Sequence, residues 1–306
     1  MCYFRSMKTI DAFEKQFPDE ISCRKFLTEM RWPNGVSCPR CGNPNVYTLK
    51  ARPFNWLCKA KDCGGKNGYR FSVLTGTIFQ DTKKPLKLWF KVGYLMLVGK
   101  KGISALQVHR VIFGEDSGSD YRTSWYMCHR WRSAMRGDYV GPLTGEVEVD
   151  ETFVGGKEVN KHWSKRSNKG RGTAGKVAVI GAIARKGMVV AKVIENTDTR
   201  TLDSFVRSTV ADDVSLIATD EHAGYRLLDK DYNHKSVTHG KGQYVRGNIH
   251  TSSIDSFWSM LKRGIMGQFH HVSKEYLPLY INEFSWRHNQ RKNPDAFRDL
   301  LTTCNK

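Results

Sequence analysis

The chain has 306 residues, a length typical of two or three domains, and 40% of them are hydrophobic, so at least one domain can bury a sizeable core. The 49 Lys and Arg residues outnumber the 30 Asp and Glu residues, and the resulting formal charge of +19 indicates a polyanionic partner. No apolar stretch approaches the roughly 20 residues that cross a bilayer. Nucleic acid is therefore favoured over a membrane as that partner.

The N-terminal part divides into a helical segment, residues 1–32, and a small loop-rich module, residues 33–80, that needs a stabilising cross-link. Four of the eight cysteines lie in this module as two pairs: Cys38-x2-Cys41 and, sixteen residues later, Cys58-x4-Cys63. Two thiolates from each of two turns can surround one Zn²⁺ tetrahedrally and leave no ligand position open. We therefore expect a zinc ribbon with one structural Zn²⁺; the alternative is a set of free buried thiols. The remaining cysteines have no partner at ligand spacing: Cys2, Cys23, Cys128 and Cys304.

Residues 81–140 are predicted to form a helical domain with helices over 86–98, 103–113 and 121–135. The last two helices and the Gly- and Ser-containing turn between them fit a helix-turn-helix. Arg122, Arg130 and Arg132 in the last helix are candidate DNA contacts, because arginines on an exposed helix can reach base edges in the major groove. The alternative is a basic, solvated helix of a bundle.

Residues 141–306 alternate between strand and helix patterns. Strands are expected at 146–154, 177–184, 188–194, 214–219 and 235–239, and helices at 201–210 (with Thr199 as the cap), 221–229, 252–264 and 274–290. A hairpin followed by helix–strand–helix–strand indicates an α/β domain with a sheet of mixed direction. A basic loop connects the first two strands.

Three aspartates in this domain are candidate site residues. Asp150 interrupts a buried strand pattern, where a charge costs several kcal/mol unless it is paired or binds a metal. Asp220 follows the strand 214–219, and Asp255 lies on the helix 252–264. Lys262 lies two helical turns after Asp255, on the same side of that helix. The alternative for Asp220 alone is a helix cap.

The chain resembles the bacterial DDE-type insertion-sequence transposases that join an N-terminal zinc ribbon to a ribonuclease H-like domain, a group related to the eukaryotic Merlin elements. The resemblance covers roughly residues 10–295 and rests on four stretches: 31–42 (RWPNGVSCPRCG), 148–157 (EVDETFVGGK), 219–225 (TDEHAGY) and 250–265 (HTSSIDSFWSMLKRGI).

The resemblance implies a ribonuclease H-like mixed sheet with flanking helices, and DNA cleavage and strand transfer as the activity. Asp150, Asp220 and Asp255 match the catalytic acids, with Asp255 at the position where the family usually has Glu. These carboxylates would hold two Mg²⁺ or Mn²⁺ ions. Lys262 matches a basic residue that contacts DNA, and Arg263 follows it.

The basic loop at residues 157–176 holds seven Lys and Arg residues against one Glu. A DNA-backbone contact is expected there, with these candidates: Lys165, Arg166, Lys169 and Arg171. The stretch 170–176 nearly matches a P-loop, but Val177 stands where Ser or Thr would bind Mg²⁺, and a strand follows. No nucleotide cofactor is expected.

We therefore expect a transposase that binds double-stranded DNA, both the terminal inverted repeats of its element and the target, as a homodimer or a larger assembly. The expected location is the bacterial cytoplasm, at the nucleoid. Two alternatives stay open: a catalytically inactive, transposase-derived DNA-binding protein, and a metal-dependent structure-selective nuclease.

Overall fold

The computed structural model describes residues 9–114, 118–136, 141–156, 162–166, 172–173, 175–237 and 249–304. The chain divides into two compact units: residues 1–135 together with 292–306, and residues 136–291. The last 15 residues therefore belong to the first unit, whereas the sequence pattern predicts them as part of the domain 141–306. The finer division at residues 32, 80 and 140 stays a prediction.

The first unit contains a three-stranded antiparallel sheet in the order β1-β2-β3 and several helices. Its elements are α1 (Ile10–Gln16), α2 (Glu20–Arg31), β1 (Val46–Thr48), β2 (Asn55–Cys58), α3 (Lys61–Gly64), η1 (Gly65–Asn67), β3 (Tyr69–Ser72), α4 (Leu86–Val98), α5 (Ala105–Ile112), α6 (Tyr121–Ala134) and α10 (Ala296–Thr302). The expected helix 86–98 is confirmed, and those at 103–113 and 121–135 are slightly shorter than expected.

Aromatic packing explains why the C-terminal helix α10 joins this unit. The ring of Phe297 lies 6.0 Å from that of Phe13, 5.7 Å from that of Phe90 and 6.3 Å from that of Trp131, between ring centroids. These rings come from α1, α4 and α6. Burial of large aromatic side chains contributes strongly to core stability, so α10 closes the core of the first unit.

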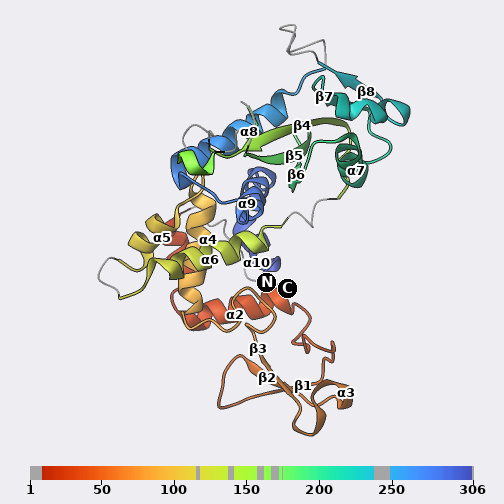
Figure 1. Ribbon diagram of the computed structural model, residues 1–306. Coiled ribbons are helices and arrows are strands. Elements are labelled where there is room, and N and C mark those ends of the chain that lie inside the picture. The colour runs from red at the N-terminus through yellow and green to blue at the C-terminus, as the bar shows by residue number, and fades with distance from the viewer. Residues whose placement is uncertain are drawn as a thin grey trace. The chain divides into compact units, whose positions relative to one another are not determined.

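The second unit contains the five-stranded mixed sheet, in the order β6-β5-β4-β7-β8 (Figure 1). Its elements are β4 (Glu146–Val154), η3 (Trp163–Lys165), β5 (Val177–Ala184), β6 (Val189–Ile194), α7 (Thr199–Thr209), β7 (Leu216–Thr219), η4 (Ala223–Lys230), β8 (His234–Ser236), α8 (Ser252–Gly264), η6 (Ile265–Phe269) and α9 (Leu277–Asn289).

The strand directions follow one pattern: β4, β5 and β6 are antiparallel neighbours, whereas β7 and β8 run parallel to β4. This confirms the ribonuclease H-like mixed sheet. The bounds of β6, β7, β8, α7 and α9 differ from the expected ones by one to three residues at the described ends, and two further details differ from expectation. Residues 223–230 form a 3₁₀ helix rather than an α-helix, and the cap of α7 is Asp198, whose carboxylate accepts from the Thr201 backbone N–H at 2.8 Å, rather than Thr199.

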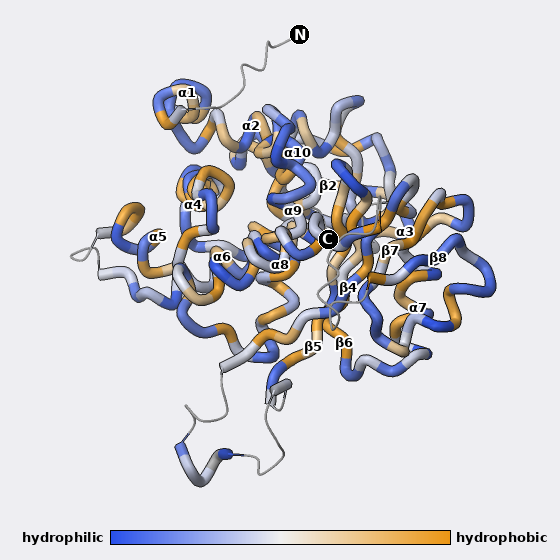
Figure 2. Tube along the Cα trace, turned by 90° about the horizontal axis from the view of Figure 1, so that it is seen from above, coloured by the Kyte–Doolittle hydropathy of each residue, from blue (hydrophilic) through white to orange (hydrophobic). Residues whose placement is uncertain are grey.

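Helices cover both faces of the sheet. Val147 and Val149 of β4 belong to the core cluster that includes α7 and η4, and the opposite face packs against α8 and α9. Figure 2 shows hydrophobic and hydrophilic residues alternating along α7, as expected for a helix with one buried face. Because side chains alternate along a strand, the even-numbered residues of β4 face α8.

Candidate active site and structural metal centre

The four clustered cysteines converge in the first unit. Cys38 Sγ lies 3.5 Å from Cys63 Sγ, Cys41 Sγ lies 3.7 Å from Cys58 Sγ, and all four sulfurs lie within 4.8 Å of one another. Zn–S bonds of about 2.3 Å in a tetrahedron separate the sulfurs by about 3.8 Å. The sulfur positions therefore fit a single structural Zn²⁺.

Local backbone geometry makes this cluster. The Gly42 N–H donates to the Cys38 carbonyl at 2.8 Å, and Gly42 has a positive φ of 73°, which glycine adopts without steric strain. Cys58 ends β2 and Cys63 lies in α3. Burial, followed by the neighbouring thiols, raises the pKa of Cys63 to about 12. A divalent cation would remove this obstacle to thiolate formation.

Two of the three expected acids meet where β7 ends beside β4. Glu148 pairs with Ala218 in the parallel register, so Asp150 and Asp220 follow at corresponding positions of the two strands. One carboxylate oxygen from each of Asp150, Glu151 and Asp220 lies within 4.8 Å of the others. The sheet thus brings together carboxylates that are 70 residues apart in the chain.

Asp150 is held against α8. Its carboxylate accepts a hydrogen bond from Trp258 Nε1 at 2.9 Å. Gly181 pairs with Asp150 across β4 and β5, and a Cβ at Gly181 would lie 2.7 Å from the Trp258 ring, so this glycine allows the indole to reach Asp150. Burial, followed by the charges of Glu151, Asp220 and Asp255, raises the pKa of Asp150 to about 7.

Glu151 is a member of the acidic group that the sequence did not indicate. Tyr225 Oη donates to its carboxylate at 2.6 Å, and His222 Nε2 lies 3.9 Å from it. Burial raises the pKa of Glu151, although the bond from Tyr225 opposes the shift. Adjacent strand residues point to opposite faces of a sheet, so alternation along β4 predicts Glu151 on the face opposite Asp150. The two carboxylates come together with that of Asp220 at the end of β7, which stops at Thr219 while β4 continues to Val154.

Asp255 lies exposed in the first turn of α8. Its carboxylate accepts from Thr251 Oγ1 at 3.1 Å, and its charge contributes to the raised pKa of Asp150. Among the described residues, however, Asp255 is not in the group whose oxygens lie within 4.8 Å. Hard divalent cations prefer such carboxylate oxygens, so Asp150, Glu151 and Asp220 fit a cation. Asp255 is outside this group but near enough for its charge to act on Asp150.

The expected DNA-contacting residues separate into three groups. Lys262 and Arg263 of α8 are exposed, as are Arg166 and, in α6, Arg122, whose side chain is 89% exposed. Residues 169 and 171 lie outside the described part of the chain, as does the side chain of Lys165. The remaining two, Arg130 and Arg132, are turned toward the protein.

Arg132 is a correction to the expected set. It is only 1% exposed, and its guanidinium lies 3.0 Å from His129 Nδ1, so it cannot reach DNA from this position. Arg130 donates to the carbonyls of Ile78 at 2.8 Å and Thr77 at 3.4 Å. Arg130 therefore joins α6 to residues 77 and 78, whereas Arg132 contacts His129 of its own helix, and neither contact forms a reading face.

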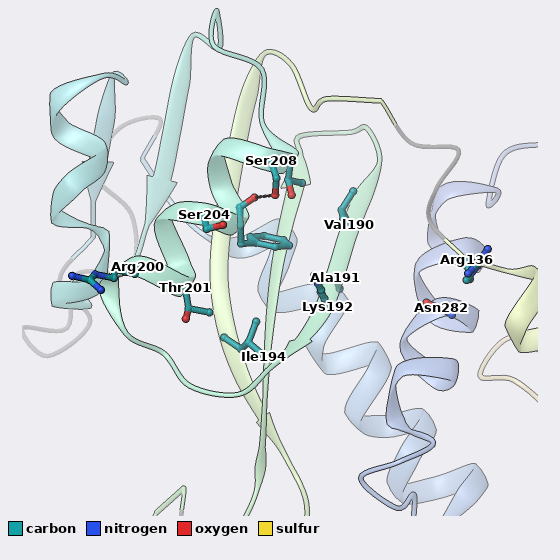
Figure 3. Close-up of a pocket in the computed structure, with 12 residues that line it drawn as sticks. Arg136, Val190, Ala191, Lys192, Ile194, Arg200, Thr201, Ser204, Ser208 and Asn282 are labelled. Carbon is teal, nitrogen blue, oxygen red and sulfur yellow. Dashed lines mark hydrogen bonds between the residues drawn. The ribbon is translucent and has the colours of Figure 1, made fainter.

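A separate pocket of about 670 Å³ lies between β6 and α7 (Figure 3). It is lined by Arg136, Lys192 and Arg200, by several hydroxyl groups and by no carboxylate. A smaller pocket of about 340 Å³ borders Asp220 and includes His222 and Tyr225. Of these two pockets, the smaller one reaches a member of the acidic group, Asp220, and the acidic group is the candidate active site.

No helix among the described residues is long and apolar enough to cross a membrane.

The comparisons with known proteins agree with this geometry. Residues 142–289 match the ISXO2-like transposase domain, and residues 18–66 match the transposase zinc-ribbon domain. An uncharacterized protein in transposable element ISH50 of Halobacterium salinarum is 29% identical over 307 residues, which cover 95% of this chain and 98% of that protein. The two domain matches enclose the cysteine cluster and Asp150 and Asp220. Residues 18–66 and 142–289 thus match two domains of insertion-sequence transposases, the zinc ribbon and the transposase domain.

Proposed function

We propose that this protein binds the ends of its insertion sequence and catalyses metal-dependent cleavage of DNA strands and their transfer into target DNA. The observation that carries the proposal is the convergence of Asp150, in the central strand β4, and Asp220, which directly follows the neighbouring strand β7 of the ribonuclease H-like sheet. Carboxylates at this separation repel one another unless a cation lies between them.

Asp150, Asp220 and Asp255 would hold two Mg²⁺ or Mn²⁺ ions, with Glu151 as a further oxygen donor. When bound, such ions stabilise the attacking and leaving oxygens of a displacement at phosphorus. Asp150 is central because it faces α8 and adjoins Asp220, so its two oxygens can serve both sides of the site. The Trp258 indole fixes one of these oxygens at 2.9 Å.

The remaining residues of the site orient the acids. Tyr225 holds Glu151 by a hydrogen bond of 2.6 Å, and Thr251 holds Asp255 by one of 3.1 Å. Asp220 accepts from the His222 backbone N–H at 3.0 Å. Each acid therefore has a neutral donor that fixes its direction without neutralising its charge, which leaves the charges available to cations.

The exposed cations are candidate contacts for the DNA backbone. Lys262 and Arg263 follow Asp255 on the same helix, and Arg166 lies in the basic loop. We propose that these residues bind phosphates beside the acids and that Arg122 binds DNA in the first unit. Two element ends must be processed together, so we propose that a homodimer or a larger assembly acts on the terminal inverted repeats.

The experiment is incubation of the protein with Mg²⁺ and labelled DNA that carries the element end, followed by separation of the products. The proposal predicts cut ends and joined products. Binding without cutting would favour the inactive DNA-binding derivative. This alternative rests on Asp255, whose side chain is shorter than that of the Glu usual at this position. Cutting without joining would favour a structure-selective nuclease.

A further inference from the structure

Another acidic residue of β4, Glu148, is fully buried at 0% exposure. It lies two residues before Asp150, so both side chains face α8. A buried carboxylate is strongly unfavourable unless it is paired and hydrogen-bonded. Glu148 has such partners in α8 and in Arg185.

Glu148 holds the start of α8. Its Oε2 accepts from the backbone N–H groups of Ser253 at 2.7 Å and Ile254 at 3.1 Å, and its Oε1 accepts from Ser253 Oγ at 3.0 Å. The residue at the N-cap of α8, Thr251, makes no side-chain capping bond. The first turn of a helix has N–H groups without partners in the helix, and here a strand 105 residues earlier supplies the acceptor.

The charge of Glu148 is balanced from the other side. Arg185 Nε donates to Glu148 Oε1 at 2.9 Å, and the same guanidinium binds Glu146. Arg185 also donates to the His250 carbonyl at 3.2 Å, just before α8. Arg185 and Glu148 therefore fasten the beginning of α8 to β4 and the β5–β6 turn.

The same helix and strand meet again one turn later, where Trp258 donates to Asp150. Asp255 lies between these two attachment points, so its distance from Asp150 depends on both. We propose that Glu148 is a positioning residue that sets Asp255 at the metal site by capping α8 from β4. This inference rests on the proposed function, because it assigns Asp255 to the cations of that site.

The test is a double-mutant cycle on Mn²⁺ binding by the zinc-loaded full chain without DNA, read from the free Mn²⁺ signal in electron paramagnetic resonance. Removing a residue that orients a metal ligand typically lowers metal affinity by about 10–100-fold. We expect Glu148→Gln and Asp255→Asn each to lower the affinity at least about 10-fold. We expect the double variant to lose no more than Asp255→Asn alone, because Glu148 acts through Asp255.

The matched control is Glu283→Gln, which removes another carboxylate with 0% exposure, in α9 and outside the acidic group. It should leave Mn²⁺ affinity within about 2-fold, whatever its effect on thermal unfolding. If Glu148→Gln fails to fold, Ser253→Ala removes one donor to Glu148 and should lower the affinity by a smaller factor, about 3-fold.

Three results would overturn the inference: unchanged affinity in Glu148→Gln, or in Ser253→Ala where that variant replaces it; losses that multiply in the double variant; and a wild-type chain that binds no Mn²⁺. The first two leave the proposed function intact if the wild type cuts and joins DNA. If the Mn²⁺ affinities follow the expected pattern but the wild type does not cleave DNA, the proposed function is rejected and the positioning role of Glu148 is still supported.

Discussion

The cysteine cluster and the acidic cluster are both groups of metal-ligating side chains whose ligand atoms lie within 4.8 Å, yet they are built differently. The cysteines lie within 26 residues of chain, three of the four are buried, and they can close completely around one ion. The acids come from β4 and from the residue that follows β7, about 70 positions further along the chain, and they are only half-buried. A closed thiolate site stabilises a small fold, whereas an open carboxylate site can admit a substrate phosphate.

The largest effect is expected from a substitution that disrupts the cysteine cluster, the closed site. Cys58→Ser should abolish zinc binding and unfold the ribbon, because structural zinc contributes about 10–16 kcal/mol of apparent binding energy in small zinc domains. Zinc content and limited proteolysis of the purified chain measure this. Cys23→Ala, a buried cysteine outside the cluster, is the matched control and should keep its zinc. A Cys58→Ser protein with a full zinc complement would contradict the account.

A substitution in the acidic cluster, the open site, should abolish DNA cleavage but leave the protein folded. Asp150→Asn should lower strand cleavage by about 10³-fold or more, since loss of a central metal ligand removes several kcal/mol of transition-state stabilisation. Affinity for DNA should stay within about 2-fold. Cleavage and binding assays on labelled end DNA measure both, with Asp213→Asn as an exposed carboxylate control. Undiminished cleavage by Asp150→Asn would place the reaction elsewhere.

Two variants decide which acid completes the site. Asp255→Asn should lower cleavage by about 100-fold, as expected for a direct ligand, whereas Glu151→Gln should lower it by about 10-fold, as expected for a supporting residue. Single-turnover cleavage rates at saturating Mg²⁺ give the comparison. The opposite ranking would make Glu151, already within the tight group, the third ligand.

When no Mg²⁺ or Mn²⁺ is bound, the open site should also make the stability of the zinc-loaded protein depend on pH. Asp150 has a pKa of about 7 in the folded protein, above the value of about 3.9 in an unfolded chain. The folded state therefore favours the protonated acid, so this contribution to stability is present below about pH 4 and is lost as the pH rises through about 7. Without added divalent cation, Asp150→Asn should raise the melting temperature at pH 8 and change it little at pH 4.

Thermal unfolding of the zinc-loaded protein in chelator-free buffer checks this prediction, because a chelator would also strip the cysteine site. Added Mg²⁺ should stabilise the wild type at pH 8 and stabilise Asp150→Asn less. Equal stability of the two proteins at pH 8 would show that Asp150 carries no electrostatic strain.

The smallest expected effect concerns the basic surface. Lys262→Ala should reduce DNA affinity modestly and lower the slope of log affinity against log salt by about one charge. Arg132→Gln should leave that slope unchanged, because Arg132 is buried. Binding measured between 50 and 200 mM salt, a range of about fourfold, separates the two. A change of slope in Arg132→Gln alone would restore the reading-helix interpretation of α6.

The closed site was predictable from the sequence because its ligands are local. The spacings Cys38-x2-Cys41 and Cys58-x4-Cys63 predicted that these four cysteines come together, and their sulfurs do converge in the structure. The sheet was also predictable, since the strand patterns at 146–154 and 177–184 have the observed bounds. The closeness of Asp150 and Asp220 depends on strand order, which the resemblance to the family supplied and the parallel register explains.

The missed features depend on contacts between distant parts of the chain. Residue type suggested that Arg132 faces DNA, but it lies four residues after the buried Cys128 and therefore shares its face of α6. Helix α10 has seven residues, too few for a periodic signal, and only the packing of Phe297 reveals where it belongs. Glu151 joins the acids because a neighbouring strand ends early, which no pattern within β4 encodes.

The most direct test of the central claim is anomalous diffraction from crystals of the full chain grown with Mn²⁺, recorded at the manganese and zinc absorption edges. Manganese peaks should lie among the carboxylates of Asp150, Asp220 and Asp255, and a zinc peak should lie among the four cysteines. Manganese peaks only at other sites, with the three aspartates bare, would contradict the claim.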